Sequence, residues 1–348
     1  MMSFLAKHNR ARRIFSLHAD QYTTAPRRAQ FIMKSQTQKI PLIIIIGPTA
    51  SGKSALGIFL AKKYNGEIVS ADSRQIYRRL TIGTGKVAGM WRRRPKPHRG
   101  SWFVSGGVPH HVIDFIPPRT HYSAAEFRRD GTLAIADITS RGKIPLLVGG
   151  TGFWIDTLVG RMSIAPAPPN TRLRTRLAKK NPKELFSLLM HLDPARAKNI
   201  DHANPHRLIR ALEIAHAGVA LPSIQSVSPY RTLWLGIALP HEEMREKITR
   251  RLRRDLRRGM VAEVRRLHAS GVSWQRLEQF GLEYRLIAHH LRGFMDKKTL
   301  LAELERVLWQ YAKRQMTWWR RNDSINWIST PEEAQRLIQI FLASNPKK

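Results

Sequence analysis

The chain has 348 residues, 42% hydrophobic and 24% charged, which is typical of a folded protein with a core domain and a second domain or insertion. Lysine and arginine number 60 against 25 acids, and the net charge of +35 indicates a polyanionic partner, either nucleic acid or an anionic membrane surface. With no cysteine, disulfides, cysteine-bound zinc and thiol catalysis are excluded. No apolar run reaches the roughly 18 residues of a membrane span. We therefore expect no membrane-embedded segment.

The first 39 residues read as a basic extension. They carry eight lysines and arginines and a single acid, Asp20, without a sustained apolar period. We predict a disordered arm that touches RNA, or an over-extended start with Met33 as the true one. An organellar presequence is the alternative, because such leaders are rich in arginine and poor in acids. Otherwise we expect a cytoplasmic location.

A phosphate-binding loop follows the first strand. The β-branched run Ile40–Ile46 predicts a strand buried on both faces of a parallel sheet. After it come Gly47-Pro48-Thr49-Ala50-Ser51-Gly52-Lys53-Ser54 and a helical stretch at 55–64. Strand, loop and helix in this order are the context that the motif G-x-x-x-x-G-K-[ST] requires. Backbone N–H groups of such a loop wrap phosphates, Lys53 meets their charge, and the Ser54 hydroxyl can bind Mg²⁺.

A second strand, within 66–77, ends on the carboxylate of Asp72. Ligands of open α/β sheets lie beyond the carboxyl ends of the strands, so Asp72 is predicted near the phosphate loop. From these residues alone three roles stay open: general base, Mg²⁺ ligand through water, or N-cap of a helix begun at Ser73.

A third apolar run, at 144–148, is followed by Gly149-Gly150-Thr151-Gly152, where an ordinary P-loop ATPase would place an aspartate. Asp114 is the other candidate for a metal-linked role; otherwise it is a turn or cap residue of a short edge segment. His110 and His111 have no metal partners at useful spacing and are predicted as loop or core residues. No kinase catalytic loop or helicase motif is visible, which disfavours ATP-driven mechanical work.

Eight segments, in this order, resemble the tRNA dimethylallyltransferase (isopentenyltransferase) family. They are GPTASGKS at 47–54, SADSRQIY at 70–77, IGTGK at 82–86, VPHHVIDF at 108–115, YSAAEFRRD at 122–130, IPLLVGGTGFWI at 144–155, NPHRLIRALEI at 204–214 and YAKRQMTWWRR at 311–321. The family transfers a dimethylallyl group from dimethylallyl diphosphate to N6 of adenosine 37 beside the anticodon of tRNA. The resemblance implies an α/β fold with a P-loop NTPase-like parallel sheet, an inserted helical domain, C-terminal helices and dependence on Mg²⁺.

The resemblance also implies residue roles. The loop from Gly47 to Ser54 holds the leaving diphosphate, with Thr49 beside it, while N–H groups, Lys53 and Mg²⁺ stabilise the developing charge. Asp72 matches the acid that accepts the N6 proton, which helps because an exocyclic amine is a weak nucleophile. The residues expected to contact tRNA are Asp72, Ser73, Arg74, Gln75, Thr151, His206, Arg207, Leu208, Ile209, Arg210 and Arg285.

The sequence departs from the family pattern in three places. Thr81 stands where an aspartate usually precedes Ile-Gly-Thr, and residues 87–107 form a longer basic stretch. The segment Gly281-Leu282-Glu283-Tyr284-Arg285 matches the family's Gly-Tyr-Arg segment only in a loose register. Arg285 is assigned through that match.

A proline-rich hinge at 165–169 precedes short predicted helices over 170–219. The resemblance implies an inserted domain that closes on the anticodon arm, and a purely structural lid is the alternative. In 204–219, Leu208, Leu212 and Ala215 form an apolar stripe. Arg207 and Arg210 lie off this stripe and are expected to be free for phosphates.

Helical periodicity continues in the C-terminal part. The segment 241–270 places Ile248, Leu252, Leu256 and Val264 on one face and six arginines around the others, namely Arg250, Arg251, Arg253, Arg254, Arg257 and Arg258. A solvated face and a sequence-independent phosphate track both remain open for them. Trp309, Trp318 and Trp319 are predicted to pack in the core rather than to stack on bases.

We expect the following organisation: a basic extension at 1–39, the first part of the core at 40–164, a helical insertion at 165–230, a return to the core with C-terminal helices at 231–332, and a terminal helix and tail at 333–348. The predicted protein is a monomer that uses Mg²⁺ and dimethylallyl diphosphate to modify the anticodon stem-loop of tRNA. The alternatives are a small-molecule P-loop kinase, which would share residues 40–64, and a non-catalytic RNA-binding protein with a regulatory P-loop.

Overall fold

The computed structural model describes residues 39–94, 100–219 and 228–344. These fall into two compact units, one of residues 39–159 and 228–344 and the other of residues 160–219. The predicted insertion at 165–230 overlaps the second unit. The alternatives weighed for residues 1–38, including a start at Met33, lie outside the described residues.

The larger unit is built on one sheet with the strand order β3-β4-β5-β2-β6-β1-β7-β8. From β5 to β8 in this order all neighbours are parallel, while β3 and β4 form an antiparallel hairpin on the β5 side. The predicted α/β class with a parallel sheet is confirmed. The strands are β1 (Ile40–Ile46), β2 (Gly66–Ala71), β3 (Met90–Arg93), β4 (Ser101–Ser105), β5 (Val108–His111), β6 (Ile144–Gly149), β7 (Tyr230–Ile237) and β8 (Ile325–Ile328).

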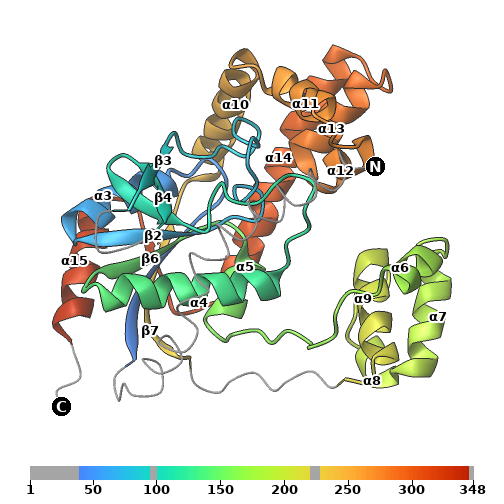
Figure 1. Cartoon of the computed structure of the whole chain (residues 1–348), viewed down its shortest axis with the longest axis horizontal. Helices are drawn as coiled ribbons and strands as arrows, with labels where there is room; N and C mark the ends of the chain where they lie inside the picture. Colours follow the sequence, from blue (N-terminus) through green and yellow to red (C-terminus); the bar gives the residue numbers. More distant parts are fainter. Residues whose placement is uncertain (1–38, 95–99, 220–227, 345–348) are drawn as a thin grey trace, which may run out of the picture. The chain divides into compact units, whose positions relative to one another are not determined.

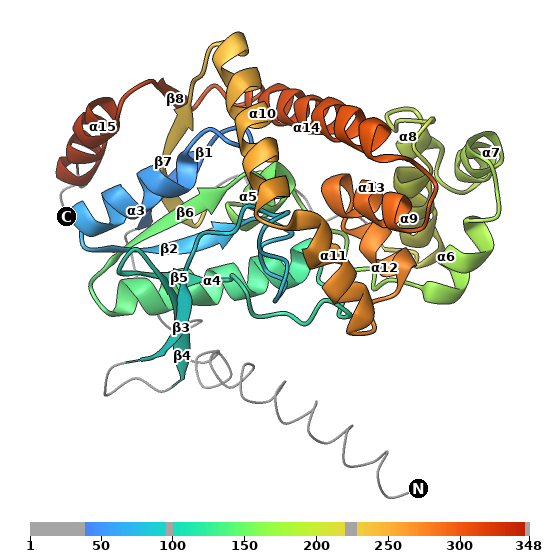
Figure 2. The same ribbon diagram turned by 90° about the horizontal axis from the view of Figure 1, so that it is seen from above.

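Strand β1 is central and buried on both faces, as predicted. Its Ile43 pairs with Leu146 of β6 on one side and Leu233 of β7 on the other. Ile43 and Ile45 share a core with α3 (Lys53–Lys63) and α15 (Pro331–Ala343). The alternate residues of β1 pack with α4 (Ala124–Ser140), α5 (Gly152–Leu158) and the C-terminal helices. Figures 1 and 2 show the sheet between these two helical layers.

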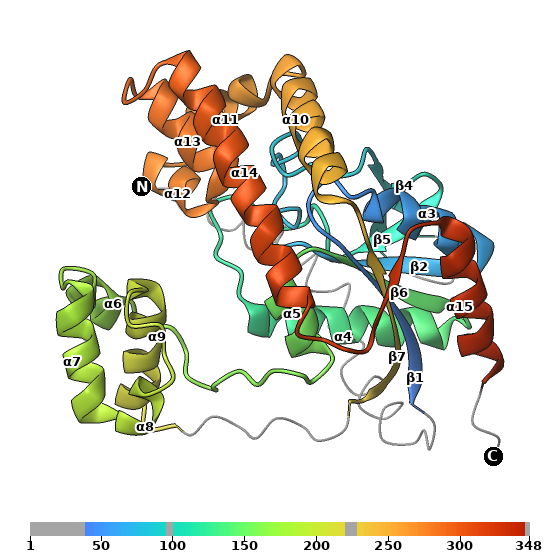
Figure 3. The same ribbon diagram turned by 180° about the vertical axis from the view of Figure 1, so that it is seen from behind.

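The C-terminal helices gather on one side of the sheet (Figure 3). They are α10 (His241–Arg257), α11 (Met260–Ala269), α12 (Trp274–Gln279), α13 (Leu282–Leu291) and α14 (Lys297–Trp319). The segment 241–270 is therefore two helices, divided at Gly259, whose φ of 93° is left-handed. Packing of the tryptophans is confirmed, since Trp319 is buried in the main core and Trp309 and Trp318 pack against it.

The smaller unit contains four described helices (Figure 1). Each begins after an asparagine or aspartate whose side chain accepts a backbone N–H of the first turn, a common helix start. Their leucines form a separate core. The helices are α6 (Thr171–Leu177), α7 (Pro182–Leu192), α8 (Pro194–Ala197) and α9 (Pro205–His216).

A buried carboxylate supports the loop where Thr81 departs from the family pattern. Glu263 of α11 accepts the backbone N–H groups of Thr81 at 3.0 Å, Ile82 at 2.8 Å and Gly83 at 3.2 Å. It also accepts the Tyr284 hydroxyl at 2.7 Å. The loop that begins at Thr81 is thus held by an acid from a helix far along the chain.

The basic stretch 87–107 contributes the hairpin β3–β4, which lies outside β5 in the sheet. The prediction that the segment around His110 and His111 forms an edge was therefore wrong, because the hairpin covers that side. Both histidines are buried, as core residues. Burial lowers the pKa of His110 to about 4, and its Nδ1 lies 2.9 Å from the Val108 carbonyl oxygen.

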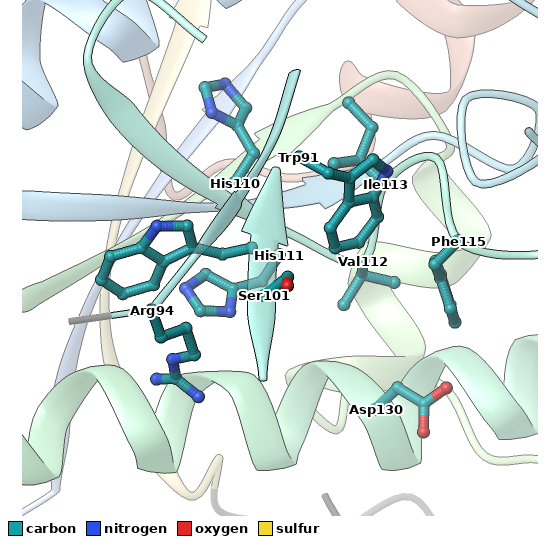
Figure 4. A pocket seen from close by; sticks show the side chains of 10 residues that line it. Trp91, Arg94, Ser101, His110, His111, Val112, Ile113, Phe115 and Asp130 are labelled. Atoms are coloured by element: carbon teal, nitrogen blue, oxygen red, sulfur yellow. The ribbon is translucent and has the colours of Figure 1, made fainter. Parts of the chain in front are cut away.

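Figure 4 shows both histidines beside a cavity that also touches the hairpin and Asp130. Its volume of about 20 Å³ leaves room only for water-sized molecules. This cavity is too small for a substrate.

No helix in the described ranges is both long and apolar enough to cross a bilayer.

Glu67, at the start of β2, is fully buried among basic groups. Its Oε2 lies 2.8 Å from His111 Nε2 and accepts Arg141 Nη2 at 2.6 Å, and its Oε1 lies 3.0 Å from Lys143 Nζ. Burial alone would raise the pKa of Glu67, but the hydrogen bonds from Arg141 and His111 outweigh it and hold the pKa far below its usual range.

We expect Glu67→Gln to lower the free energy of unfolding at pH 7 by about 3–5 kcal/mol, because it leaves buried cations without their partner. The pKa of Glu67 is lower in the folded state than in the unfolded state, where it is about 4.3. Ionised Glu67 therefore stabilises the fold above about pH 4.3, and this stabilisation is lost as pH falls through the folded-state pKa. Between about pH 5 and 3 the parent should therefore lose more stability than the variant. Urea unfolding across this range measures both effects.

The control is Glu243→Gln on α10, where the side chain is 46% exposed and pairs with Lys247. It should change stability by less than about 0.5 kcal/mol. A Glu67→Gln variant with the stability and pH profile of the parent would contradict the assignment of this buried ion cluster.

Candidate active site

The phosphate loop joins β1 to α3 and leaves the start of α3 open. Gly52, the N-cap residue, has φ 90° and makes no side-chain cap to the first helical turn. The Ser51 hydroxyl is buried and has no hydrogen-bond partner within the described residues. Free N–H groups at a helix start, with a buried donor beside them, form a cradle for an anion such as phosphate.

Lys53 lies within this cradle. Its Nζ donates to the Pro48 carbonyl oxygen at 3.2 Å. Burial lowers its pKa to about 8; the nearby Asp72 opposes this shift and Arg251 adds to it. A bound anion would raise the pKa again, because it stabilises the ammonium form.

Thr49 ties the loop to two C-terminal helices. Its N–H donates to Gln315 Oε1 at 2.8 Å, and Gln315 Nε2 donates to the Gly150 carbonyl oxygen at 3.0 Å. Arg251 Nη1 donates to Thr49 Oγ1 at 2.7 Å, while its Nε lies 3.1 Å from Asp255 Oδ2. Arg251 was predicted on a solvated or phosphate-track face, and this is corrected: its side chain points to the phosphate loop.

The roles of Gln315 and Arg251 were not predicted from the sequence, although weak signals for them exist. Gln315 follows Ala312 in the buried stripe of α14, and a polar residue in such a stripe indicates a buried hydrogen bond. Arg251 precedes by four residues Asp255, which is buried on α10.

Close packing explains the glycines that follow β6. A Cβ on Gly149 would overlap the Ala71 carbonyl oxygen, and one on Gly150 would overlap the Gln315 amide. A Cβ on Gly152 would strike the indole of Trp318. The aspartate of an ordinary P-loop ATPase does not fit here, because β2 and α14 approach the backbone too closely.

Thr151, within the same loop, joins the ends of β6 and β2. Its N–H donates to the Ala71 carbonyl oxygen at 3.1 Å, and its Oγ1 accepts the Ser73 N–H at 3.1 Å. Both residues therefore lie at the carboxyl edge of the sheet. Their contact with tRNA stays a prediction.

Asp72 directly follows β2 and caps a turn. Its Oδ1 accepts the N–H of Arg74 at 2.9 Å and of Gln75 at 3.2 Å. Residues 73–76 form turns, so the predicted helix at Ser73 is corrected. In the part of the chain that the structure describes, no hydrogen bond reaches Oδ2. This oxygen is therefore available for a proton or a cation.

The Arg74 guanidinium is held in place beside Asp72. Its Nη1 lies 2.6 Å from Glu283 Oε2, and it sits over the Tyr311 ring at 5.5 Å. Burial would lower the pKa of Arg74, but the charges of Glu283 and Asp72 raise it above its usual value. Arg74 thus supplies a fixed positive charge at the site, and its contact with tRNA stays a prediction.

Two other predicted tRNA residues differ in their surroundings. Gln75 Nε2 donates to the carbonyl oxygen of Thr84 at 3.2 Å, which attaches the turn after Asp72 to the loop at 82–86. Arg285 is exposed on α13. Neither position tests the predicted contact with RNA.

In the smaller unit, Arg210 is not free for phosphates, and that prediction is corrected. Its Nη1 pairs with Glu213 at 3.2 Å and its Nη2 donates to the Ala167 carbonyl oxygen at 2.9 Å. Arg174 shares the same carboxylate at 2.7 Å. Glu213 therefore joins α6, α9 and the segment before α6.

The other predicted tRNA residues of α9 differ in exposure. The side chain of Leu208 is fully buried in the leucine core and offers no surface to RNA, which corrects its assignment. Ile209 packs partly against that core. His206 and Arg207 are exposed at the first turn of the helix and remain predicted contacts.

Asp114 has no metal-linked role, because both its oxygens are engaged. Oδ1 lies 2.6 Å from Lys86 Nζ, and Oδ2 accepts the Trp91 indole N–H at 3.1 Å. Among the described residues, no group of three or more acids or histidines is arranged to hold a metal. Mg²⁺ needs no such group, since it usually takes one or two protein ligands together with substrate phosphates and water. The Ser54 hydroxyl and the Asp72 carboxylate fit that donor set.

Two family models match the chain: IPP transferase over residues 75–322 and Isopentenyl transferase over residues 40–90. The chain is 40% identical to tRNA dimethylallyltransferase 2 of Trichlorobacter lovleyi over 82% of this chain and 91% of that protein. It is 38% identical to tRNA dimethylallyltransferase 1 of Geotalea daltonii, over 82% and 90%.

Solved structures agree with these matches. The tRNA delta(2)-isopentenylpyrophosphate transferase of Staphylococcus epidermidis is 32% identical with a TM-score of 0.61, covering 89% of this chain and all of that one. A eukaryotic dimethylallyltransferase acting on tRNA has a TM-score of 0.69 at 24% identity, over 89% and 81%, and supports the fold alone. These matches do not support the kinase and the non-catalytic alternatives.

We expect the affinity for inorganic diphosphate to fall as pH rises through about 8, because Lys53, whose pKa lies near that value, then loses its charge. The fall should approach about tenfold per pH unit. Lys53→Arg keeps the charge at all these pH values, so comparison with it removes the titration of diphosphate itself. Isothermal titration calorimetry from about pH 6.5 to 9.5 measures the difference. If the affinity of the two proteins depends on pH in the same way, the group that loses its proton near pH 8 is not Lys53.

Gln315→Ala should weaken diphosphate binding by roughly tenfold, because two backbone groups lose their partner at about 1–3 kcal/mol each and the loop loses its anchor. Gln310→Ala is the matched control, since Gln310 is on the same helix and makes no hydrogen bond among the described residues. Calorimetry and thermal unfolding separate binding from stability. If Gln315→Ala binds diphosphate as the parent does but unfolds at a lower temperature, Gln315 stabilises the fold without shaping the phosphate site.

Proposed function

The chain belongs to the tRNA dimethylallyltransferase family, and from this premise we propose how its own residues divide the work of prenyl transfer. The protein is an enzyme of the P-loop α/β class, a prenyltransferase that modifies tRNA. One observation carries the proposal: Lys53 begins the helix after β1 and Asp72 directly follows β2, and since both strands run parallel to β6, the two residues lie at the same carboxyl edge of the sheet. A diphosphate and a proton acceptor are thereby brought to one place.

The donor in this proposal is dimethylallyl diphosphate. Its diphosphate binds in the loop from Gly47 to Ser54, with Lys53 and Arg251 as cations. As the bond between the allylic carbon and the diphosphate oxygen breaks, charge builds on that oxygen. Preorganised N–H groups and cations stabilise this charge more than that of the bound donor, and so they accelerate the step.

The acceptor is the exocyclic N6 of adenosine 37 in the anticodon loop. N6 forms a bond to the allylic carbon, diphosphate leaves, and the proton of N6 passes to Asp72. Oδ1 of Asp72 holds the turn through Arg74 and Gln75, which leaves Oδ2 for this proton. The fixed positive charge of Arg74 lies beside this carboxylate.

Mg²⁺ is part of the proposal, and the Ser54 hydroxyl and the Asp72 carboxylate are the groups that would hold it, directly or through water. When bound, it would neutralise charge on the diphosphate oxygens. Lys53 and Arg251 act on the same oxygens from the protein side. The buried hydroxyl of Ser51 provides a further donor within the loop.

The direct test is mass spectrometry of nucleosides from tRNA incubated with the protein, Mg²⁺ and dimethylallyl diphosphate. We expect a mass gain of one dimethylallyl group on adenosine, and oligonucleotide fragments of the same tRNA should place it at position 37 only. ATP in place of the donor should give no product. Transfer of phosphate from ATP to a small-molecule acceptor would instead support the kinase alternative.

Asp72→Asn should separate chemistry from binding. Asparagine keeps the Oδ1 that accepts the N–H groups of Arg74 and Gln75, but it is not a base. Single-turnover transfer at saturating donor and tRNA should fall by about 10²–10⁴-fold, while both affinities change little. The exposed Asp323→Asn serves as the control. A rate within about threefold of the parent would leave Asp72 as a turn cap and the base unidentified.

A further inference from the structure

Helix α10 has two faces with different tasks. Met244, Ile248 and Leu252 are buried in the main core, where α10 packs on α14. The opposite face carries Arg250, Arg253, Arg254 and Arg257, whose spacing places them in one row along the helix. All four are exposed. We call this row the arginine face.

The arginine face has one exposed acid at its beginning, Glu246, whose Oε2 is 3.9 Å from Arg250 Nη2, and no exposed acid follows it up to residue 270. Between 247 and 270 the acids are Asp255 and Glu263, and both are buried. Asp255 bonds to Arg251 and Arg254, and Glu263 is engaged by the loop at 81–83. Three further exposed arginines follow, Arg258, Arg265 and Arg266.

Such a row is unfavourable for the isolated helix. Like charges three or four residues apart destabilise a helix by about 0.2–0.5 kcal/mol per pair. The helix dipole offsets this only in the last turn, where cations are favoured. Arg254 is partly compensated by Asp255 at 3.0 Å and Arg250 weakly by Glu246 at 3.9 Å, but Arg253 and Arg257 make no ion pair within the described ranges. A polyanion would supply the missing counter-charge.

We propose that the arginine face is a phosphate track that binds the backbone of the substrate tRNA outside the nucleotide held in the active site. This inference rests on the proposed function, since it takes RNA as the substrate. The location supports it: Arg251, next to Arg250 in sequence, reaches Thr49 of the phosphate loop from the same rigid helix. RNA that delivers a base to this site therefore passes near α10.

RNA suits this surface better than a membrane does. An amphipathic helix binds a bilayer by inserting an exposed apolar face. The apolar residues of α10, Met244, Ile248 and Leu252, are buried instead. Guanidinium groups in a row match phosphate oxygens by charge and by hydrogen bonds, without reading base sequence.

The test removes three charges with Arg250→Gln, Arg253→Gln and Arg257→Gln together, sparing Arg254 for Asp255. Affinity for unmodified tRNA is measured between about 50 and 200 mM salt for this variant and the parent. Because each lost phosphate contact lowers the slope of log affinity against log salt by about 0.7–0.9, we expect a slope smaller by roughly 2 to 3. Replacing the same three arginines with lysine should restore most of the slope.

The control removes the same charge with Lys39→Gln, Lys62→Gln and Lys63→Gln, exposed residues near the amino ends of β1 and β2. We expect this variant to keep the parent slope. If both triple variants lower the slope equally, the net charge of the protein and not the arginine face determines the salt dependence, which would refute the proposal. An unchanged slope in the arginine variant would refute it as well.

Two further measurements distinguish this inference from neighbouring ones. Single-turnover transfer at saturating tRNA should be the same in the arginine variant and the parent, because the track is outside the site. If the parent transfers no prenyl group, the proposed function fails while the salt slope still tests the track. Binding to phosphatidylserine vesicles that is lost in the variant, with RNA binding intact, would make this face a membrane contact and refute the proposal.

Discussion

Thr49 is held from two sides, by the Gln315 amide on its N–H and by the Arg251 guanidinium on its hydroxyl. A strand-to-helix loop with free N–H groups is a general phosphate cradle, but its shape is soft unless something outside the loop fixes it. Here α14 and α10 do so. Because both helices also pack in the main core, the shape of the phosphate site depends on the packing of the whole C-terminal half. This dependence explains why the chain leaves the sheet after β7, builds five helices and only then returns as β8.

The same dependence determines what the sequence could reveal. Strand β1, the phosphate loop and the position of Asp72 follow from local periodicity, a local motif and the rule that ligands lie at the carboxyl ends of parallel strands. The two anchors of Thr49 span 266 and 202 positions of the chain, and no local pattern encodes such pairings. Arg251 shows the limit clearly. On a helical wheel it is one of six similar arginines, and only the tertiary fold turns it inward.

Other differences between expectation and structure have the same physical origin. Gly149, Gly150 and Gly152 read as a missing aspartate in sequence, yet they are glycines because Ala71, Gln315 and Trp318 occupy the space of their side chains. Arg210 lies off the apolar stripe of α9, as expected, but a buried Glu213 three residues away captures it. Buried carboxylates recruit cations, since an uncompensated buried charge is costly. The sequence pattern predicts which face of a helix a side chain lies on. Whether an arginine on that face is free to bind phosphate depends on the acids that pair with it in the folded protein.

Ion pairing also determines where the net charge of +35 is located, because it compensates the cations at the active site and leaves many exposed cations uncompensated. Cations beside the active site are compensated by nearby acids. Arg74 pairs with Glu283, and Arg251 pairs with Asp255. The charge of Asp72 acts on Lys53. The excess is therefore carried by exposed side chains such as those of α10. For a transferase this division is useful, because a site as positive as the surface would bind the diphosphate product as firmly as the transition state and delay its release. A nearly balanced site can bind a diphosphate, stabilise the charge that grows as it departs, and let it go, while the unbalanced surface holds the RNA.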